Sequence, residues 1–144
     1  MNIKIFRNLI NLHSTSGKGY KVHLINHENI NNYLDFIPDY FYDLCPAHQA
    51  DYVRIFVVLK FGGIWMDSDT LVLNNLDSLF DLINNDDSMG FFIKQNNEIL
   101  CNGLFGSRPN TKLFLQIKND MVDILNVKKN KINWEEIGNK LFQK

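Results

Sequence analysis

The feature that most constrains this chain is a long, mostly apolar segment that runs into two glycines and then two aspartates, PAHQADYVRIFVVLKFGGIWMDSD, over residues 46–69. Pro46 suits the first position of a helix, and residues 46–61 are too many for an ordinary strand, so we expect a buried helix there. Glycine accepts the left-handed conformation that helix ends favour, so the glycine pair ends that helix. Residues 64–66 then predict a very short buried strand. The two aspartates therefore come directly after a strand, and we expect that strand to be central in the sheet.

Strand and helix patterns alternate along the rest of the chain. The predicted elements are a helix over 2–13, a short strand over 20–25, a helical turn over 79–83, strands over 90–94 and 99–106, and helices over 109–126 and 134–142. No repeat, linker or composition break divides them. The sequence therefore favours one α/β domain over residues 1–144.

Composition excludes several classes of protein. With 144 residues, 45% hydrophobic and 22% charged, the chain is typical of one soluble globular domain. A net charge of −1 excludes the broad positive surface of a nucleic-acid binder, so no nucleic-acid partner is expected. No transmembrane segment or signal peptide is predicted, and we expect a cytoplasmic protein. Cys45 and Cys101 are too few for a disulfide scaffold and lack zinc-site spacing.

Asp67 and Asp69 are candidate metal ligands. In an extended segment the side chains at positions i and i+2 point the same way, so both carboxylates can converge on one small target. Mg²⁺ and Mn²⁺ prefer oxygen ligands and often bridge one or two carboxylates to substrate phosphates. The alternative is a pair of solvated aspartates in a turn. Their position after a buried strand favours the cation, because two adjacent carboxylates repel unless a cation lies between them.

Asp51 and Arg54 lie three residues apart on the predicted helix, and hence on one face. One interpretation is an ion pair that neutralises a rare charge in an apolar helix. The other adds a ligand, because a guanidinium and an anchored carboxylate together can grip sugar hydroxyls or phosphate oxygens. Gly62 and Gly63 need no role beyond the helix stop, although small residues would also let a substrate approach the backbone.

The order of these residues carries a family resemblance. The stretch AHQADYVRIFVVLKFGGIWMDSDTLVL, over 47–73, resembles the central motif of the DXD-containing GT-A glycosyltransferases. The resemblance is to the branch that includes capsular polysaccharide synthesis proteins and the glucosyltransferase domains of large clostridial toxins. It implies a GT-A, Rossmann-like α/β fold and transfer of a hexose from a nucleotide-sugar donor to a glycan or protein acceptor hydroxyl, with Mn²⁺ or Mg²⁺ as cofactor, in polysaccharide or glycan synthesis.

The same resemblance implies roles for individual residues. Asp67 would touch the ribose or sugar of the donor and help to place the metal, and Asp69 would ligate the metal on the diphosphate. Asp51 and Arg54 would hold the donor sugar. Asn102 falls in a region that lines the acceptor side in such enzymes. A bound divalent cation would stabilise the negative charge of the departing nucleoside diphosphate.

The chain also departs from the family pattern. Typical members begin with an additional strand and loop that stack the nucleotide base, and they continue further after the last predicted helix. We therefore expect a domain that is incomplete at both edges, and by itself a poor or inactive transferase. An uncovered sheet edge would also favour self-association.

Two other functions remain open. The sequence DSDTLV resembles the first motif of haloacid dehalogenase-type phosphatases, with Asp67 as nucleophile, Asp69 as acid/base and Asp86-Asp87 as the later acidic pair. Only sixteen residues separate Asp69 from Asp86, too few for the βα units expected between them. The second alternative is a catalytically inactive binding module derived from a transferase.

Overall fold

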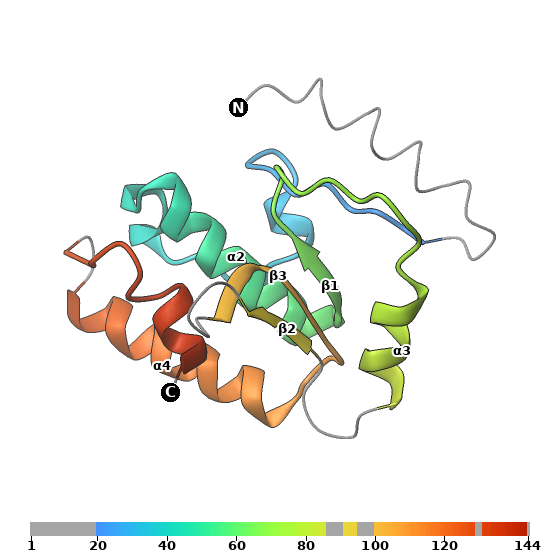
Figure 1. Ribbon diagram of the computed structural model, residues 1–144. Helices are drawn as coiled ribbons and strands as arrows, with labels where there is room; N and C mark the ends of the chain where they lie inside the picture. Colours follow the sequence, from blue (N-terminus) through green and yellow to red (C-terminus); the bar gives the residue numbers. More distant parts are fainter. Residues whose placement is uncertain (1–19, 86–90, 95–99, 129–130, 144) are drawn as a thin grey trace.

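A computed structural model describes residues 20–85, 91–94, 100–128 and 131–143 (Figure 1). Its elements, in chain order, are the 3-10 turns η2 (Ile30–Asn32) and η3 (Asp39–Asp43), helix α2 (Pro46–Phe61), strand β1 (Gly63–Met66), helix α3 (Asp77–Asn85), strands β2 (Phe91–Lys94) and β3 (Leu100–Ser107), helix α4 (Lys112–Lys128) and the turn η5 (Asn139–Gln143). The expected mixed α/β class is confirmed. Of the described helices, none is both long and apolar enough to cross a membrane.

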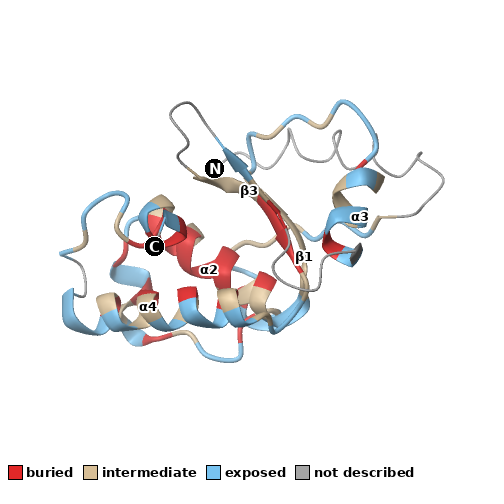
Figure 2. Cartoon of the chain, turned by 60° about the horizontal axis from the view of Figure 1, so that its bottom comes forward, coloured by how far each residue is buried: buried red, intermediate tan, exposed pale blue. Residues whose placement is uncertain are grey.

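The three described strands form an antiparallel sheet in the order β1-β3-β2. Helices α2 and α4 lie on one side of the sheet and α3 on the other (Figure 2). We had expected the aspartates to follow a central strand, and this is wrong for the described sheet, in which β1 is at an edge. Only residues 95–99 separate β2 from β3, and so short a connection joins antiparallel neighbours rather than parallel ones.

The core lies between the sheet and the helices α2 and α4. The Phe105 ring of β3 stacks on Phe114 of α4 with centroids 5.4 Å apart, and Phe142 of η5 packs on the same ring at 5.4 Å. The next residue of β3, Gly106, points to the opposite face, where an added Cβ would come within 2.7 Å of Ile83 on α3. This alternation is that of a strand buried on both faces, and it fixes which side of β3 faces α2.

The predicted local elements are confirmed to different degrees. Helix α2 has the predicted bounds, whereas α4 begins at Lys112 rather than at 109, because Asn110 adopts a φ of 58° and its N–H donates to Leu59 O at 2.7 Å. The strand expected over 20–25 is absent; Tyr20 instead stacks on Phe80 of α3. The helix expected over 134–142 is a series of turns followed by η5. The helix expected over 2–13 lies outside the described residues.

The glycine pair between α2 and β1 provides a test of this junction. Gly62 and Gly63 have φ values of 68° and 98°, which strain any residue with a side chain. An added Cβ on Gly62 would also lie 2.7 Å from Cδ of Pro109, whereas one on Gly63 would meet no atom within 4 Å. We expect Gly62→Ala to lower the free energy of unfolding by about 2–3 kcal/mol and Gly63→Ala by about 1 kcal/mol in urea denaturation. Equal losses would contradict the close packing at Pro109.

Candidate functional site

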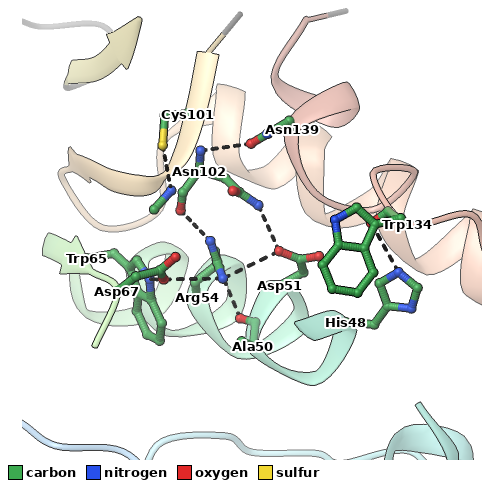
Figure 3. A network of polar contacts seen from close by, with 11 residues as sticks. His48, Ala50, Asp51, Arg54, Trp65, Asp67, Cys101, Asn102, Trp134 and Asn139 are labelled. Atoms are coloured by element: carbon green, nitrogen blue, oxygen red, sulfur yellow. Dashed lines mark hydrogen bonds and ion pairs between the residues drawn. The ribbon is translucent and has the colours of Figure 1, made fainter. Parts of the chain in front are cut away.

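Arg54 is the centre of a buried polar network that joins α2 to the ends of β1 and β3 (Figure 3). Its Nη2 lies 3.5 Å from Oδ1 of Asp51 and 3.3 Å from Oδ1 of Asp67. Its Nη1 donates to the carbonyl of Asn102 at 2.6 Å, and its Nε donates to the carbonyl of Ala50 at 3.2 Å. One guanidinium thus holds two carboxylates and a strand backbone in a fixed arrangement.

Asp51 is the buried carboxylate of this network, with a side chain that is 8% exposed. Its Oδ1 accepts a hydrogen bond from Nδ2 of Asn102 at 2.7 Å. Gly138 covers the other side, where an added Cβ would lie 3.0 Å from Oδ2 of Asp51. Burial raises the pKa of Asp51, and the nearby charge of Asp67 adds to the rise, while Arg54, His48 and the Asn102 hydrogen bond lower it. The carboxylate is therefore positioned to organise its neighbours rather than to meet solvent.

Asp67 is the more accessible carboxylate, with a side chain that is 35% exposed. It follows the last residue of β1, and its N–H donates to the carbonyl of Gly103 at 2.7 Å. Its Oδ1 accepts a hydrogen bond from Nε1 of Trp65 at 2.8 Å. Gly103 leaves room for the carboxylate, because an added Cβ would lie 3.0 Å from Oδ2 of Asp67. The backbone, an indole and Arg54 together fix the orientation of a carboxylate that still reaches solvent.

Asn102 enters the network through an irregularity in β3. Cys101 pairs with Ile93 and Phe105 pairs with Phe92, so residues 102–104 have no partners on β2. Such bulges re-aim side chains locally. The Asn102 side chain turns to Asp51, and its backbone N–H donates to Oδ1 of Asn139 at 3.0 Å.

The structure brings four of the predicted site residues together, Asp51, Arg54, Asp67 and Asn102. It does not bring the glycine pair to them, because that pair lies at the opposite end of β1 from Asp67. Asp69 is exposed, and it lies in a turn closed by a hydrogen bond from Thr70 N–H to the Asp67 carbonyl at 3.0 Å. The expectation that the two aspartates share one side of an extended segment is therefore wrong, because the strand ends before them. Asp86 and Asp87 lie outside the described residues.

Sequence reasoning missed several neighbours of the network. Trp65 could have been found, because it lies two residues before Asp67 at the end of the same strand. His48 is one helical turn before Asp51, and it is buried rather than exposed on the surface. Trp134 and Asn139 come from the C-terminal segment, and no pattern in the sequence links them to residues so far away.

Asp67 and Asp69 carry carboxylate oxygens, which are the kind of ligand that a hard divalent cation prefers. Within the described part of the chain, no group of three or more histidine, cysteine, aspartate or glutamate side chains could hold a metal ion. Mg²⁺ and Mn²⁺ beside substrate phosphates often use only one or two protein carboxylates, with water as the remaining ligands. Trp65 and Arg54 both contact Oδ1 of Asp67, whereas Oδ2 of Asp67 and the exposed Asp69 carboxylate take no part in these contacts.

Comparison with known proteins places this geometry in a family. The model of the capsular polysaccharide synthesis protein family matches residues 4–134. An uncharacterized glycosyltransferase of Acanthamoeba polyphaga mimivirus is 32% identical over 136 residues, covering 87% of this chain and 51% of that protein. An uncharacterized protein of Arabidopsis thaliana is 39% identical over 44 residues, which are 31% of this chain and 7% of that protein.

The chain thus spans about half of the viral relative and a small part of the plant one. No solved structure is significantly similar to it. The family match covers the whole polar network except the C-terminal turn that carries Asn139. The chain belongs to the capsular polysaccharide synthesis protein family.

Proposed function

We propose that this chain is the donor-binding part of a glycosyltransferase, which moves a hexose from a nucleotide sugar to an acceptor hydroxyl with the help of Mn²⁺ or Mg²⁺. The observation that carries the proposal is the partly exposed Asp67 carboxylate, which buried Arg54 holds and which exposed Asp69 follows two residues later in the chain. The family match and the viral relative named a glycosyltransferase support sugar transfer in polysaccharide synthesis. The GT-A arrangement of the complete domain is part of the same proposal.

Charge balance explains why this site would take a cation with a diphosphate. Arg54 balances one of the two carboxylates that it contacts, and Asp69 adds another negative group, so the site keeps an excess of negative charge. A diphosphate alone would be repelled there, and the protein's net charge of −1 supplies no broad positive field. A divalent cation, when bound, joins the two and stabilises the charge that develops on the leaving nucleoside diphosphate.

The protein's own residues would supply orientation. Asp51 and Arg54 are buried, so we assign them first to holding Asp67 and the Asn102 backbone in place, and through these to positioning the donor sugar. Asn102, half-buried in the bulge of β3, would lie on the acceptor side. Correct placement matters because small displacements of reacting groups cost about 10²-fold in rate.

Isothermal titration calorimetry with a panel of nucleotide sugars, with and without Mn²⁺, tests the proposal. We expect binding only with the metal, and we expect Asp69→Asn to weaken it about tenfold, because the variant removes one of two carboxylate ligands. Asp123→Asn is the matched control, since Asp123 is an exposed aspartate on α4. Equal binding without metal, or by the Asp69→Asn variant, would contradict the proposed role.

The same preparation separates the alternatives. A phosphatase would hydrolyse small phosphomonoesters and form an aspartyl phosphate at Asp67. An inactive binding module would bind the nucleotide sugar without releasing the nucleoside diphosphate. A protein of neither kind would give no heat with any nucleotide sugar.

A further inference from the structure

Trp134 is an exposed indole beside the buried network. The residue is 72% exposed, although tryptophan is among the most costly side chains to leave in water. Its backbone is anchored, because buried His48 of α2 donates a hydrogen bond from Nε2 to the Trp134 carbonyl at 3.2 Å. The two rings are 6.2 Å apart and tilted by 44°.

The segment that carries this indole is fastened to the network at its other end. Gly138 is buried against Asp51 and Asn102, where an added Cβ would come within 3.0 Å of both side chains. Asn139 accepts the hydrogen bond from the Asn102 backbone. These contacts anchor residues 134–139 beside the network, and the Trp134 ring lies near the ring of buried His48.

The indole and the exposed carboxylate lie at opposite ends of this network. Figure 3 shows Trp134 and His48 at one end, Asp67 and Trp65 at the other, and Arg54 with Asp51 between them. A ligand that reached from one end to the other would meet carboxylate oxygens at the first end and an aromatic face at the second. The two ends thus suit chemically different parts of a ligand.

We propose that Trp134 is a stacking platform for a sugar ring at this site, an inference that rests on the proposed function. The face of an aromatic ring carries negative charge density, and the C–H groups on the flat side of a pyranose are weakly positive and apolar. Binding sites combine such an apolar wall with a few fixed polar groups that set orientation. The phosphates belong to the Asp67 end, so the ring at Trp134 is a sugar, of the acceptor or of the donor.

The test uses the indole N–H signals of ¹⁵N-labelled protein, which has only two tryptophans. Trp134→Phe assigns the two signals. The probes are methyl hexopyranosides in one arm and nucleotide sugars with diamagnetic Mg²⁺ in the other. We expect the Trp134 signal to shift. In calorimetry we expect Trp134→Ala to weaken the same binding by about three- to tenfold, which corresponds to the range of aromatic stacking energies. A shift with free pyranosides identifies an acceptor sugar. A shift with nucleotide sugars alone, which the nucleoside diphosphate without a sugar does not cause, identifies the donor sugar, and the same shift with the nucleoside diphosphate would overturn the assignment to a sugar ring.

Phe36→Ala is the matched control, because Phe36 is 69% exposed on the segment between η2 and η3 and takes no part in the network. It should leave binding unchanged, and Trp134→Phe should retain most of it. If nucleotide sugars with Mg²⁺ move the Trp65 signal while no sugar moves the Trp134 signal, the platform is wrong and the proposed function stands. If neither signal moves with any probe, both are wrong.

Discussion

Replacement of Arg54 by methionine is expected to lower the free energy of unfolding by about 4 kcal/mol, the range for breaking a buried ion pair. Methionine has a similar length but no charge, so Asp51 would be left buried without its cation. The Asn102 carbonyl would also lose its donor. Urea denaturation followed by circular dichroism measures the loss.

Asp51→Asn is the informative companion variant. Burial raises the pKa of Asp51 in the folded protein above the ordinary pKa of an aspartate. Stability is therefore lost as the pH rises from the ordinary pKa through the higher pKa of the folded protein, because ionising the buried carboxyl group costs folding free energy. Asparagine still accepts the Asn102 hydrogen bond and carries no charge. We therefore expect Asp51→Asn to leave stability at neutral pH nearly unchanged and to flatten its decline with rising pH.

The double variant measures the energetic coupling between Asp51 and Arg54. Asp51→Asn together with Arg54→Met should recover part of the loss caused by Arg54→Met alone, because no charge is then stranded at the buried position. Additive losses in the double variant, or a loss below about 1 kcal/mol for Arg54→Met, would contradict the account of a buried charge network.

Asp67→Asn is expected to have the largest effect on ligand binding. Asparagine keeps the shape that Trp65 and Arg54 contact, but it removes the charge of the carboxylate best oriented toward a cation. Loss of residues that only support metal ligands costs about 10- to 100-fold in affinity, so we expect at least about 100-fold weaker metal-dependent binding of a nucleoside diphosphate. Calorimetry measures it, and any release of nucleoside diphosphate from a nucleotide sugar should fall in parallel.

This expected loss exceeds that for Asp69→Asn, because Asp69 lies in an exposed turn and is less well fixed. Unchanged urea denaturation of the Asp67→Asn variant would show that the loss is local. A result in which Asp69→Asn weakens binding more than Asp67→Asn would show that the network does not position the principal ligand.

The elements that the sequence predicted well are those fixed by local pattern. The Pro46 start and the Gly62 stop bracket α2, and the apolar run after it predicts β1. The order of the sheet was not predictable in this way, because pairing of β1 with β3 joins residues some forty positions apart. The prediction of a strand at 20–25 was wrong. Alternation indicates only that one side of a segment is buried, and Tyr20 stacks on Phe80 of α3 in a segment that pairs with no described strand.

In the candidate site too, contacts within one helix were predictable and contacts between distant segments were not. Asp51 and Arg54 were predictable as neighbours, because their helical spacing alone places them on one face. Their contact with Asp67 was not, because it depends on how β1 lies against α2. Trp134 and Asn139 were beyond prediction, because only the fold of the C-terminal segment brings them to Asn102 and His48.

The most direct test of the account is paramagnetic broadening by Mn²⁺ in the presence of a nucleoside diphosphate. Nε1 of Trp65 donates to Asp67, so a Mn²⁺ ion on that carboxylate would lie close to the indole N–H. We expect the Trp65 signal to broaden at a lower Mn²⁺ concentration than the Trp134 signal, and we expect Asp67→Asn to remove this selectivity. Equal broadening of both signals, or selective broadening that persists in Asp67→Asn, would contradict a cation site at Asp67.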